Sequence, residues 1–430
     1  MKEISNYLIH FIEQEFINKE KNIFMNQSKT TEFQKLFLEN ILQEIRKAEL
    51  EYTKINSTLI KQEFPISINN INKSDDFSYI PQSIRNQIEN TEIKSVSYKF
   101  SLFEQQIQIY IAIPSTIKKW KSYFESCLHR IYLWLFIIYP YRNNSCSQTL
   151  DIYLYLLDIP KRMNPNNHVI LNQEMINTAF TFSCKKNNSI NIFREEEWFK
   201  VFIHETMHSN CLDFSDSLKL TEISKNRILN MFSIQTRSTP LSSSEFNRTI
   251  PLKAPLFSNP DVLLYETYSE LNAELINIIF FIYFSTKKND ENYHKLCLKK
   301  FKKYLIYESV FSCFQSTKVL HYNKVKYQDI HTKKPNNYRE QTNVFVYYVL
   351  KSILLNHIDD YFEWLFNKNK GSLKFIKTEK QINSFVDLIQ KNYMNPSYLL
   401  KIENMEKWFL KNNRNRIENT TLRMSLLEFV

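Results

Sequence analysis

Glycine is almost absent from this chain of 430 residues, which contains Gly371 as its only glycine and has five alanines. Glycine usage is about 7% in average proteins, whereas this chain is rich in Lys, Asn, Ile, Phe and Tyr, the residues of AT-rich codons. We interpret the shortage first as the codon bias of an AT-rich genome. Turns must then rely on asparagine, which tolerates a left-handed backbone better than most residues, and residues 185–189 are predicted to be such a turn.

Features of secreted and membrane proteins are also missing. The six cysteines are scattered and form no CxxC pair, which favours reduced thiols inside a cell over a disulfide framework. The N-terminus has no apolar core of a signal peptide. The best candidate for a membrane span, residues 132–141, is too short and contains Pro140. The sequence therefore predicts a soluble intracellular protein without membrane contact.

Positive charge is in excess, with a net charge of +11 at pH 7. Such an excess can indicate acidic partners such as nucleic acid. The same codon bias enriches lysine, however, and no cluster of Lys and Arg interleaved with aromatic residues stands out. Nucleic-acid binding is therefore not predicted.

The composition is that of a folded protein, because hydrophobic residues make up 43% of the chain and aromatic residues 15%. The length favours two to three domains, or one large domain with additions. We expect an N-terminal helical region over residues 1–75, a catalytic core over 76–290 and a C-terminal helical region over 291–430. The predicted fold class is α+β, mostly helical.

Period-two alternation and turn residues predict the strands of the central region. They lie at residues 95–114 (two strands around a short turn), 149–160, 175–184 and 189–193. The last two are expected to form a hairpin through Asn187-Asn188. A long apolar helix is predicted at about 115–138, and residues 62–90 are expected to be loosely structured. Beyond residue 215 the chain is predicted to be mainly helical, with a new helix starting at Asn259-Pro260.

The stretch VFIHETMHSN, residues 201–210, places His204 and His208 four positions apart, with Glu205 directly after the first. On a helix four residues turn about 400° and rise about 6 Å, so both imidazoles can reach one ion. Glu205 is rotated about 100° away and can contact a metal-bound water without being a ligand. A zinc ion (Zn2+) lowers the pKa of that water towards 7, and the carboxylate takes its proton as the water attacks a carbonyl.

The motif alone does not establish a metal site, because an HExxH match also arises by chance. The alternative is an amphipathic helix that carries two hydrogen-bonded histidines. The context favours the metal site, since the motif follows a predicted hairpin and its acidic first turn, residues 195–197, suits a helix N-terminus.

Catalytic zinc takes three protein ligands and leaves one position open. A third ligand six residues after His208 is excluded, because Phe214 occupies that position and Asp213 is one residue out of register. The third ligand must therefore come from elsewhere in the chain.

The stretch YETYSELNAEL, residues 265–275, offers Glu266, Glu270 and Glu274 on one face of a helix. A solvated acidic stripe would show lysines at i+4, and none occurs between residues 261 and 286. We therefore expect these acids to need another cation, such as zinc. Glu266 supported by Glu270 and Glu270 supported by Glu274 both fit. We prefer Glu266 as the ligand and expect Glu274 to contribute little.

HETMH with a later ETYSE resembles the gluzincin zinc metallopeptidases. Residues 177–215 are also similar to uncharacterised metallopeptidases of large AT-rich DNA viruses, and the useful resemblance covers about residues 170–280. It implies a zincin-like core, in which a small mixed sheet packs on the motif helix. It also implies that NTAFTFS, residues 177–183, is an edge strand that pairs with the backbone of the substrate.

The resemblance further implies a tyrosine or histidine that stabilises the oxyanion. Tyr338, His321 and Tyr347 are candidates by residue type, and each has a structural role as its alternative. Asp213 is either an acceptor for a ligand histidine or a helix cap.

The sequence thus predicts a zinc-dependent endopeptidase with a polypeptide substrate. One alternative is a zinc amidohydrolase that acts on a non-peptide amide. Another is a basic structural or packaging protein on an inactive zincin scaffold. The intact His204, Glu205 and His208 argue against the inactive scaffold.

Overall fold

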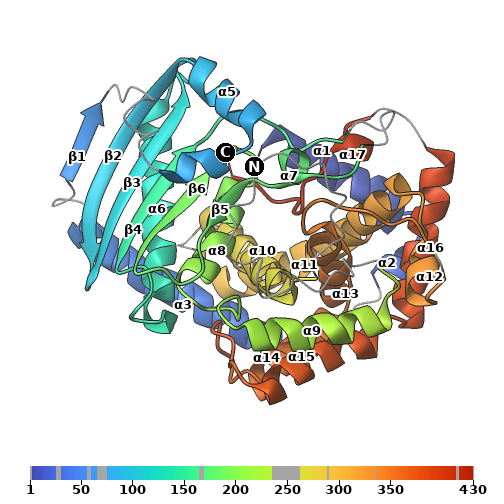
Figure 1. Cartoon of the computed structure of the whole chain (residues 1–430). Helices are drawn as coiled ribbons and strands as arrows, with labels where there is room; N and C mark the ends of the chain where they lie inside the picture. Colours follow the sequence, from blue (N-terminus) through green and yellow to red (C-terminus); the bar gives the residue numbers. More distant parts are fainter. Residues whose placement is uncertain are drawn as a thin grey trace, which may run out of the picture.

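The computed structural model describes residues 2–25, 31–55, 60–64, 75–163, 169–234, 262–287, 290–334, 336–412 and 416–429. A twisted sheet forms one side of the molecule and helices form the other, with α8 and α10 between them (Figure 1). The fold class is α+β and mostly helical, as predicted.

The sheet has six strands in the order β1-β2-β3-β4-β6-β5. Their bounds are β1 (Ile60–Phe64), β2 (Ile93–Leu102), β3 (Gln105–Pro114), β4 (Thr149–Tyr155), β5 (Ala179–Thr181) and β6 (Asn187–Ile192). Strands β3, β4 and β6 run parallel, and the other pairs are antiparallel. The short strand β5 is therefore an antiparallel edge strand.

The strands predicted at 95–114, 149–160 and 189–193 are confirmed within a few residues. The strand predicted at 175–184 is only Ala179–Thr181, because Gln173–Ile176 form helix α7. The turn between the last two strands is also not where we expected it. Asn187 and Asn188 belong to β6, because Thr181 pairs with Ile190, so the turn covers residues 182–186. Cys184 takes the left-handed conformation there, with φ 47°. Asn188 is instead buried, and its side chain donates to the Phe182 carbonyl at 2.7 Å.

The region expected to be loose also contains regular structure. Strand β1 extends the sheet beyond β2, and helix α5 (Gln82–Asn90) lies on one sheet face. Ile84 and Ile88 of α5 pack with Ala112 and Tyr155. Neither element was predicted, because this stretch is rich in Asn and Ser and lacks a long periodic run.

The remaining helices of the described residues, in chain order, are α1 (Glu3–Ile12), η1 (Glu13–Ile17), α2 (Lys21–Phe24), α3 (Glu32–Ile55), η2 (Asp75–Tyr79), α6 (Trp120–Ile138), η3 (Tyr139–Tyr141), α7 (Gln173–Ile176), α8 (Trp198–Ser209), α9 (Leu218–Met231), α10 (Leu264–Ser285), α11 (Tyr293–Tyr322), α12 (Tyr327–His331), η4 (Phe345–Leu350), α13 (Lys351–Asn356), α14 (Ile358–Asn367), α15 (Glu379–Asn392), α16 (Pro396–Lys411) and α17 (Ile417–Thr420). The predicted apolar helix at 115–138 is α6, which begins at Trp120.

Beyond residue 215 the described part of the chain is mainly helical, as expected. The predicted helix start at Asn259-Pro260 lies outside the described residues, and α10 begins at Leu264. One hydrophobic cluster contains residues of all three predicted regions, for example Leu8, Ile152 and Phe311. The division at residues 75 and 290 stays a prediction.

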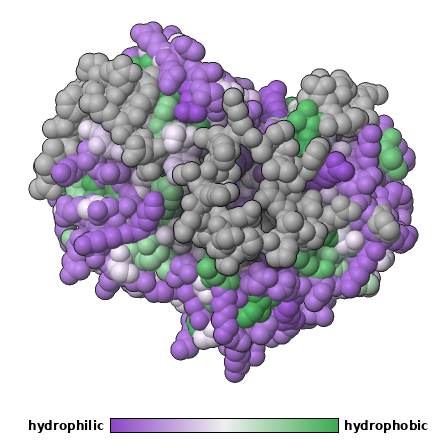
Figure 2. All heavy atoms as spheres, viewed as in Figure 1, coloured by the Kyte–Doolittle hydropathy of each residue, from purple (hydrophilic) through white to green (hydrophobic). Residues whose placement is uncertain are grey.

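The apolar character of the helices and the state of the cysteines can be compared with the expectations from the sequence. Within the described ranges, we find no helix whose length and apolar character would suffice to cross a bilayer, and hydrophilic residues cover most of the coloured surface in Figure 2. The expectation of reduced cysteines is wrong for one pair, because Cys146 and Cys184 form a disulfide. The fold brings the loop before β4 against the β5–β6 turn, which residue spacing did not reveal.

Candidate metal centre

Helix α8 carries the HExxH motif through the interior. All twelve of its residues are buried, because it packs between strands β5 and β6 and helix α10. Thr206, on the face away from α10's acids, accepts a hydrogen bond from the Trp134 indole at 2.6 Å. The packing of α8 therefore fixes the positions of its two histidines.

Three donor atoms converge between α8 and α10. His204 Nε2 lies 2.9 Å from His208 Nε2 and 3.0 Å from Glu266 Oε2. His208 Nε2 lies 3.3 Å from the same carboxylate oxygen. Zinc–nitrogen bonds of about 2.0–2.1 Å in a tetrahedral site place ligand atoms roughly 3.3 Å apart. These residues form a group that could hold a metal ion, and their spacing fits zinc.

Glu270 supports the first histidine, as the sequence suggested. Its Oε2 lies 3.2 Å from His204 Nδ1, the nitrogen that faces away from the donor group. A carboxylate in this position holds the Nδ1–H tautomer and leaves the Nε2 lone pair available to a metal. The distances thus put Glu266 in the donor group and Glu270 behind it.

The expectation that the acids of this helix lack protein cations is wrong for two of them. Lys200 Nζ lies 2.5 Å from Glu270 Oε1, and Lys351 Nζ lies 2.5 Å from Glu274 Oε2 and 3.4 Å from Glu270 Oε1. These lysines come from α8 and α13, so the i+4 rule could not find them. Glu266 instead contacts the two motif histidines.

Asp213 supports the second histidine. Its Oδ2 contacts His208 Nδ1 and accepts a hydrogen bond from Ser269 Oγ at 3.2 Å. The helix-cap alternative is wrong, because Ser217 caps the next helix through the Leu220 amide. Each motif histidine therefore has a buried carboxylate on its outer nitrogen.

The charges of the donor group depend on one another. Burial acts to lower the pKa of His204, but hydrogen bonds to Glu266 and Glu270 outweigh it and raise the pKa to about 9. Burial likewise opposes ionisation of His208, and Asp213 and Glu266 raise its pKa well above the usual value. The two histidines in turn hold the pKa of Glu266 below its usual range against the effect of burial. Without a metal, protons occupy the site at neutral pH.

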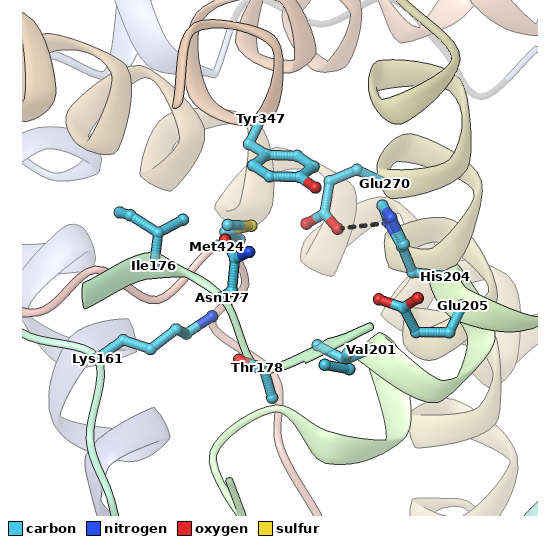
Figure 3. Close-up of a pocket in the computed structure, with 11 residues that line it drawn as sticks. Lys161, Ile176, Asn177, Thr178, Val201, His204, Glu205, Glu270, Tyr347 and Met424 are labelled. Atoms are coloured by element: carbon cyan, nitrogen blue, oxygen red, sulfur yellow. Dashed lines mark hydrogen bonds and ion pairs between the residues drawn. The ribbon is translucent and has the colours of Figure 1, made fainter. Parts of the chain in front are cut away.

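Glu205 lies beside the donor group in a pocket. Figure 3 shows His204 and Glu205 on one wall, Tyr347 above them and Lys161 opposite. The full lining consists of Lys161, Ile176, Asn177, Thr178, Ala179, Val201, His204, Glu205, Glu270, Tyr347 and Met424. Burial raises the pKa of Glu205, although both motif histidines act to lower it. A carboxylate with a raised pKa is suited to accept and return a proton near neutral pH.

Of the three residues considered for oxyanion binding, the structure brings one to the site. Tyr347 donates from its hydroxyl to Glu266 Oε2 at 3.0 Å, and burial raises its pKa well above the usual value, so it stays protonated. Tyr338 donates instead to Glu340 at 2.5 Å, and the His321 ring stacks on Phe409. Neither of these two lines the pocket.

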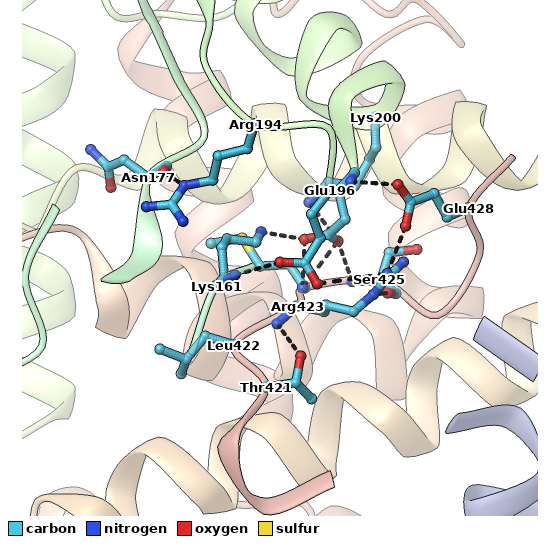
Figure 4. Close-up of polar contacts among 12 residues, drawn as sticks. Lys161, Asn177, Arg194, Glu196, Lys200, Thr421, Leu422, Arg423, Ser425 and Glu428 are labelled. Atoms are coloured by element: carbon cyan, nitrogen blue, oxygen red, sulfur yellow. Dashed lines mark hydrogen bonds and ion pairs between the residues drawn. The ribbon is translucent and has the colours of Figure 1, made fainter. Parts of the chain in front are cut away.

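The C-terminal segment, residues 421–429, packs beside the site and forms hydrogen bonds with Glu197, the residue before α8. Its amides at Met424 and Ser425 donate to the Glu197 carboxylate, which also contacts Lys161. Burial disfavours ionisation of Glu197, but Lys161 and Lys200 outweigh it and lower its pKa to about 2. Figure 4 shows this segment among the charged side chains.

Lys351 connects the C-terminal segment to the metal centre. Its Nζ donates to the Met424 carbonyl at 2.7 Å and also contacts Glu270. Sequence reasoning missed Lys200, Lys351 and Glu197. For Lys200 a signal existed, because it stands among Trp198, Phe199, Val201 and Phe202 in the sequence, and a lysine buried with such residues needs an acidic partner.

The edge strand β5 and the residues before it border the same pocket. Asn177, Thr178 and Ala179 line it beside His204 and Glu205. An edge strand next to a pocket can pair with an extended backbone.

Comparison of the chain with protein-family models, with curated proteins and with solved structures finds no match to any of them.

Proposed function

We propose that this chain is a zinc-dependent metallopeptidase of the gluzincin type. The observation that carries the proposal is the convergence of three donor atoms within 3.3 Å of one another, with Glu205 beside them. The carboxylates behind both histidines add support, because such outer partners are typical of metal sites.

His204, His208 and Glu266 would hold the ion. A zinc ion in this position supplies a water of lowered pKa and a Lewis acid for a carbonyl oxygen. Glu205 would take the proton of the attacking water and deliver it to the leaving amine. Tyr347, which stays protonated, would turn its hydroxyl from Glu266 towards the oxygen that gains negative charge.

A polypeptide is the proposed substrate because β5 is the last strand of the sheet in the described part of the chain, and Asn177, Thr178 and Ala179 line the pocket. An extended peptide that pairs with β5 would place its carbonyl near Glu205. The zincin-like character of the core is part of this proposal. It rests on the mixed sheet with an antiparallel edge strand packed on the motif helix.

The test compares the wild-type protein with Glu205→Gln and His204→Ala. We expect one zinc per chain in the wild type and in Glu205→Gln, and none in His204→Ala, by elemental analysis. Digestion of a peptide library should fall by about 10²–10⁴-fold in Glu205→Gln, because the general base is lost. Absence of zinc from protein purified without chelators would exclude the proposal. Zinc without peptide cleavage, together with hydrolysis of a small amide, would favour the amidohydrolase alternative.

A further inference from the structure

Three cysteines far apart in the sequence meet at the C-terminal end of helix α8. Cys146 precedes β4, Cys184 lies in the β5–β6 turn, and Cys211 follows the motif helix. Their sulfur atoms all lie within 4.8 Å of one another. Cys146 and Cys184 are bonded, whereas Cys211 is not in a disulfide. Thiol–disulfide exchange needs a free thiol beside a disulfide, because the attacking sulfur must reach a bonded one, and these three residues provide both groups.

The sulfur cluster is attached to the backbone that ends α8. The amides of Cys184 and Cys211 both donate to the His208 carbonyl, at 3.4 and 3.0 Å. Ser147, next to Cys146, donates from its hydroxyl to the Ser209 carbonyl at 2.7 Å. The two loops that the disulfide joins therefore cap the helix that carries the motif.

We propose that Cys146, Cys184 and Cys211 form a disulfide-exchange site, in which the Cys211 thiol exchanges with the Cys146–Cys184 disulfide. The Cys211 sulfur attacks Cys184 Sγ as it loses its proton, and the Cys184–Cys211 bond forms while the Cys146–Cys184 bond breaks. Cys146 leaves with the electron pair and takes up one proton. The reaction is an isomerisation, so it needs no external oxidant or reductant.

The three sulfurs differ in burial and in polar neighbours, and these differences indicate the role of each in the exchange. Cys184 is half-buried, while Cys146 and Cys211 are buried, so a small thiol or disulfide from solution reaches Cys184 first. Lys377 Nζ lies 2.7 Å from Cys211 Sγ, and the thiol donates to Asp216 Oδ2 at 3.1 Å. These two polar groups are placed to exchange a proton with Cys211.

Re-pairing would change how α8 ends. In the present pairing Cys211 contacts the His208 carbonyl through its amide, and Asp216 and Lys377 through its sulfur. A Cys184–Cys211 bond would connect directly the two residues whose amides bind the His208 carbonyl. The disulfide-exchange site is inferred from the positions of the three sulfurs and does not depend on the proposed peptidase activity.

The test maps disulfides in the full-length protein. The wild type is equilibrated in a buffer of reduced and oxidised glutathione, quenched with acid, alkylated and digested for mass spectrometry. We expect Cys146–Cys184 as the main pair and Cys184–Cys211 as a measurable second pair. Burial raises the pKa of the Cys211 thiol, so the final pairing is measured and not the rate. A wild type that contains only Cys146–Cys184 would overturn the proposal.

Three variants sharpen the result. Cys146→Ser should form Cys184–Cys211, and Cys211→Ser should show only Cys146–Cys184. Cys313→Ser is the matched control and should show the wild-type pairs. Cys313 is a buried cysteine outside any disulfide, and its sulfur accepts a hydrogen bond from Ser352. If folded Cys146→Ser protein carries glutathione on Cys184 or leaves Cys184 and Cys211 unpaired, the proposal fails. It also fails if reduced wild type binds a second zinc that Cys211→Ser loses, because the cluster would then be a metal site.

Discussion

Substitution of Glu270 tests the geometry of the metal centre most directly. The Glu270 carboxylate contacts His204 Nδ1 at 3.2 Å and does not belong to the donor group. Loss of such an outer partner typically lowers metal affinity by about 10–100-fold, which corresponds to about 1.4–2.7 kcal/mol. Glu270→Gln keeps an oxygen that can accept a hydrogen bond from Nδ1–H, so its loss of zinc affinity should be about 10-fold. Glu270→Ala loses the hydrogen bond, so its loss of zinc affinity should be about 100-fold.

The lysines around Glu270 decide whether these variants fold. Removal of one partner from a buried ion pair usually costs about 3–5 kcal/mol, because the other charge is left alone. Here Lys200 still has Glu197 at 3.6 Å, and Lys351 still has Glu274 at 2.5 Å. We therefore expect Glu270→Gln to lose less stability than that range and to remain folded.

The assay is competition for zinc with a chelator of known affinity, combined with urea unfolding of the metal-free protein. Glu274→Gln is the matched control, because it removes a buried carboxylate one turn further along α10 that contacts Lys351 and no motif histidine. It should lower stability and leave zinc affinity within about twofold of the wild type. Glu266→Gln should abolish stoichiometric binding, since two protein ligands would remain. The reasoning is refuted if Glu274→Gln weakens zinc binding while Glu270→Ala does not.

Three further predictions concern protons, the tyrosine and the disulfide. The pKa of His204 is about 9 in the folded metal-free protein and about 6.5 in the unfolded chain. Its contribution to the stability of the metal-free protein is thus complete below pH 6.5 and lost as the pH rises through 9. Urea unfolding at several pH values would measure this loss, and a free energy of unfolding that stays constant over this window would contradict the assignment. Tyr347→Phe should retain zinc and lower kcat by about 10²–10³-fold if the hydroxyl binds the oxyanion, and unchanged kcat would remove it from the mechanism. Reduction of the Cys146–Cys184 disulfide, which closes a loop with a sequence separation of 38, should lower the free energy of unfolding by roughly 3–4 kcal/mol; equal unfolding midpoints with and without reductant would show that the bond contributes nothing.

Local pattern predicted the elements that carry the site, because their residues repeat with a clear period. The alternation in residues 95–114 correctly predicted β2 and β3, and the apolar residues around the HExxH motif correctly predicted α8. The same period placed Glu266, Glu270 and Glu274 on one face of α10, but it left open which of them lies nearest to the histidines.

The partners of these residues could not be predicted, because they come from distant parts of the chain. Lys351 reaches Glu270 from α13, and the amides that bind Glu197 belong to residues 424 and 425. The disulfide joins two loops whose contact depends on the parallel pairing of β4 with β6. A single sequence contains no local signal for contacts of this kind, so the lack of lysines near Glu270 in the sequence was misleading.

The burial of residues 421–429 behind the metal centre also has a consequence for biosynthesis. The ribosome completes the motif helix long before it makes Met424 and Ser425, whose amides bind Glu197 at the start of that helix. At about 5–20 residues per second, the roughly 200 residues in between take about 10–40 s to synthesise. During this time Glu197 lacks its amides, and Lys351, once it is made, still lacks the Met424 carbonyl. A nascent chain would therefore contain both motif histidines without a finished site, and any hydrolytic activity would begin only once synthesis had passed these last residues.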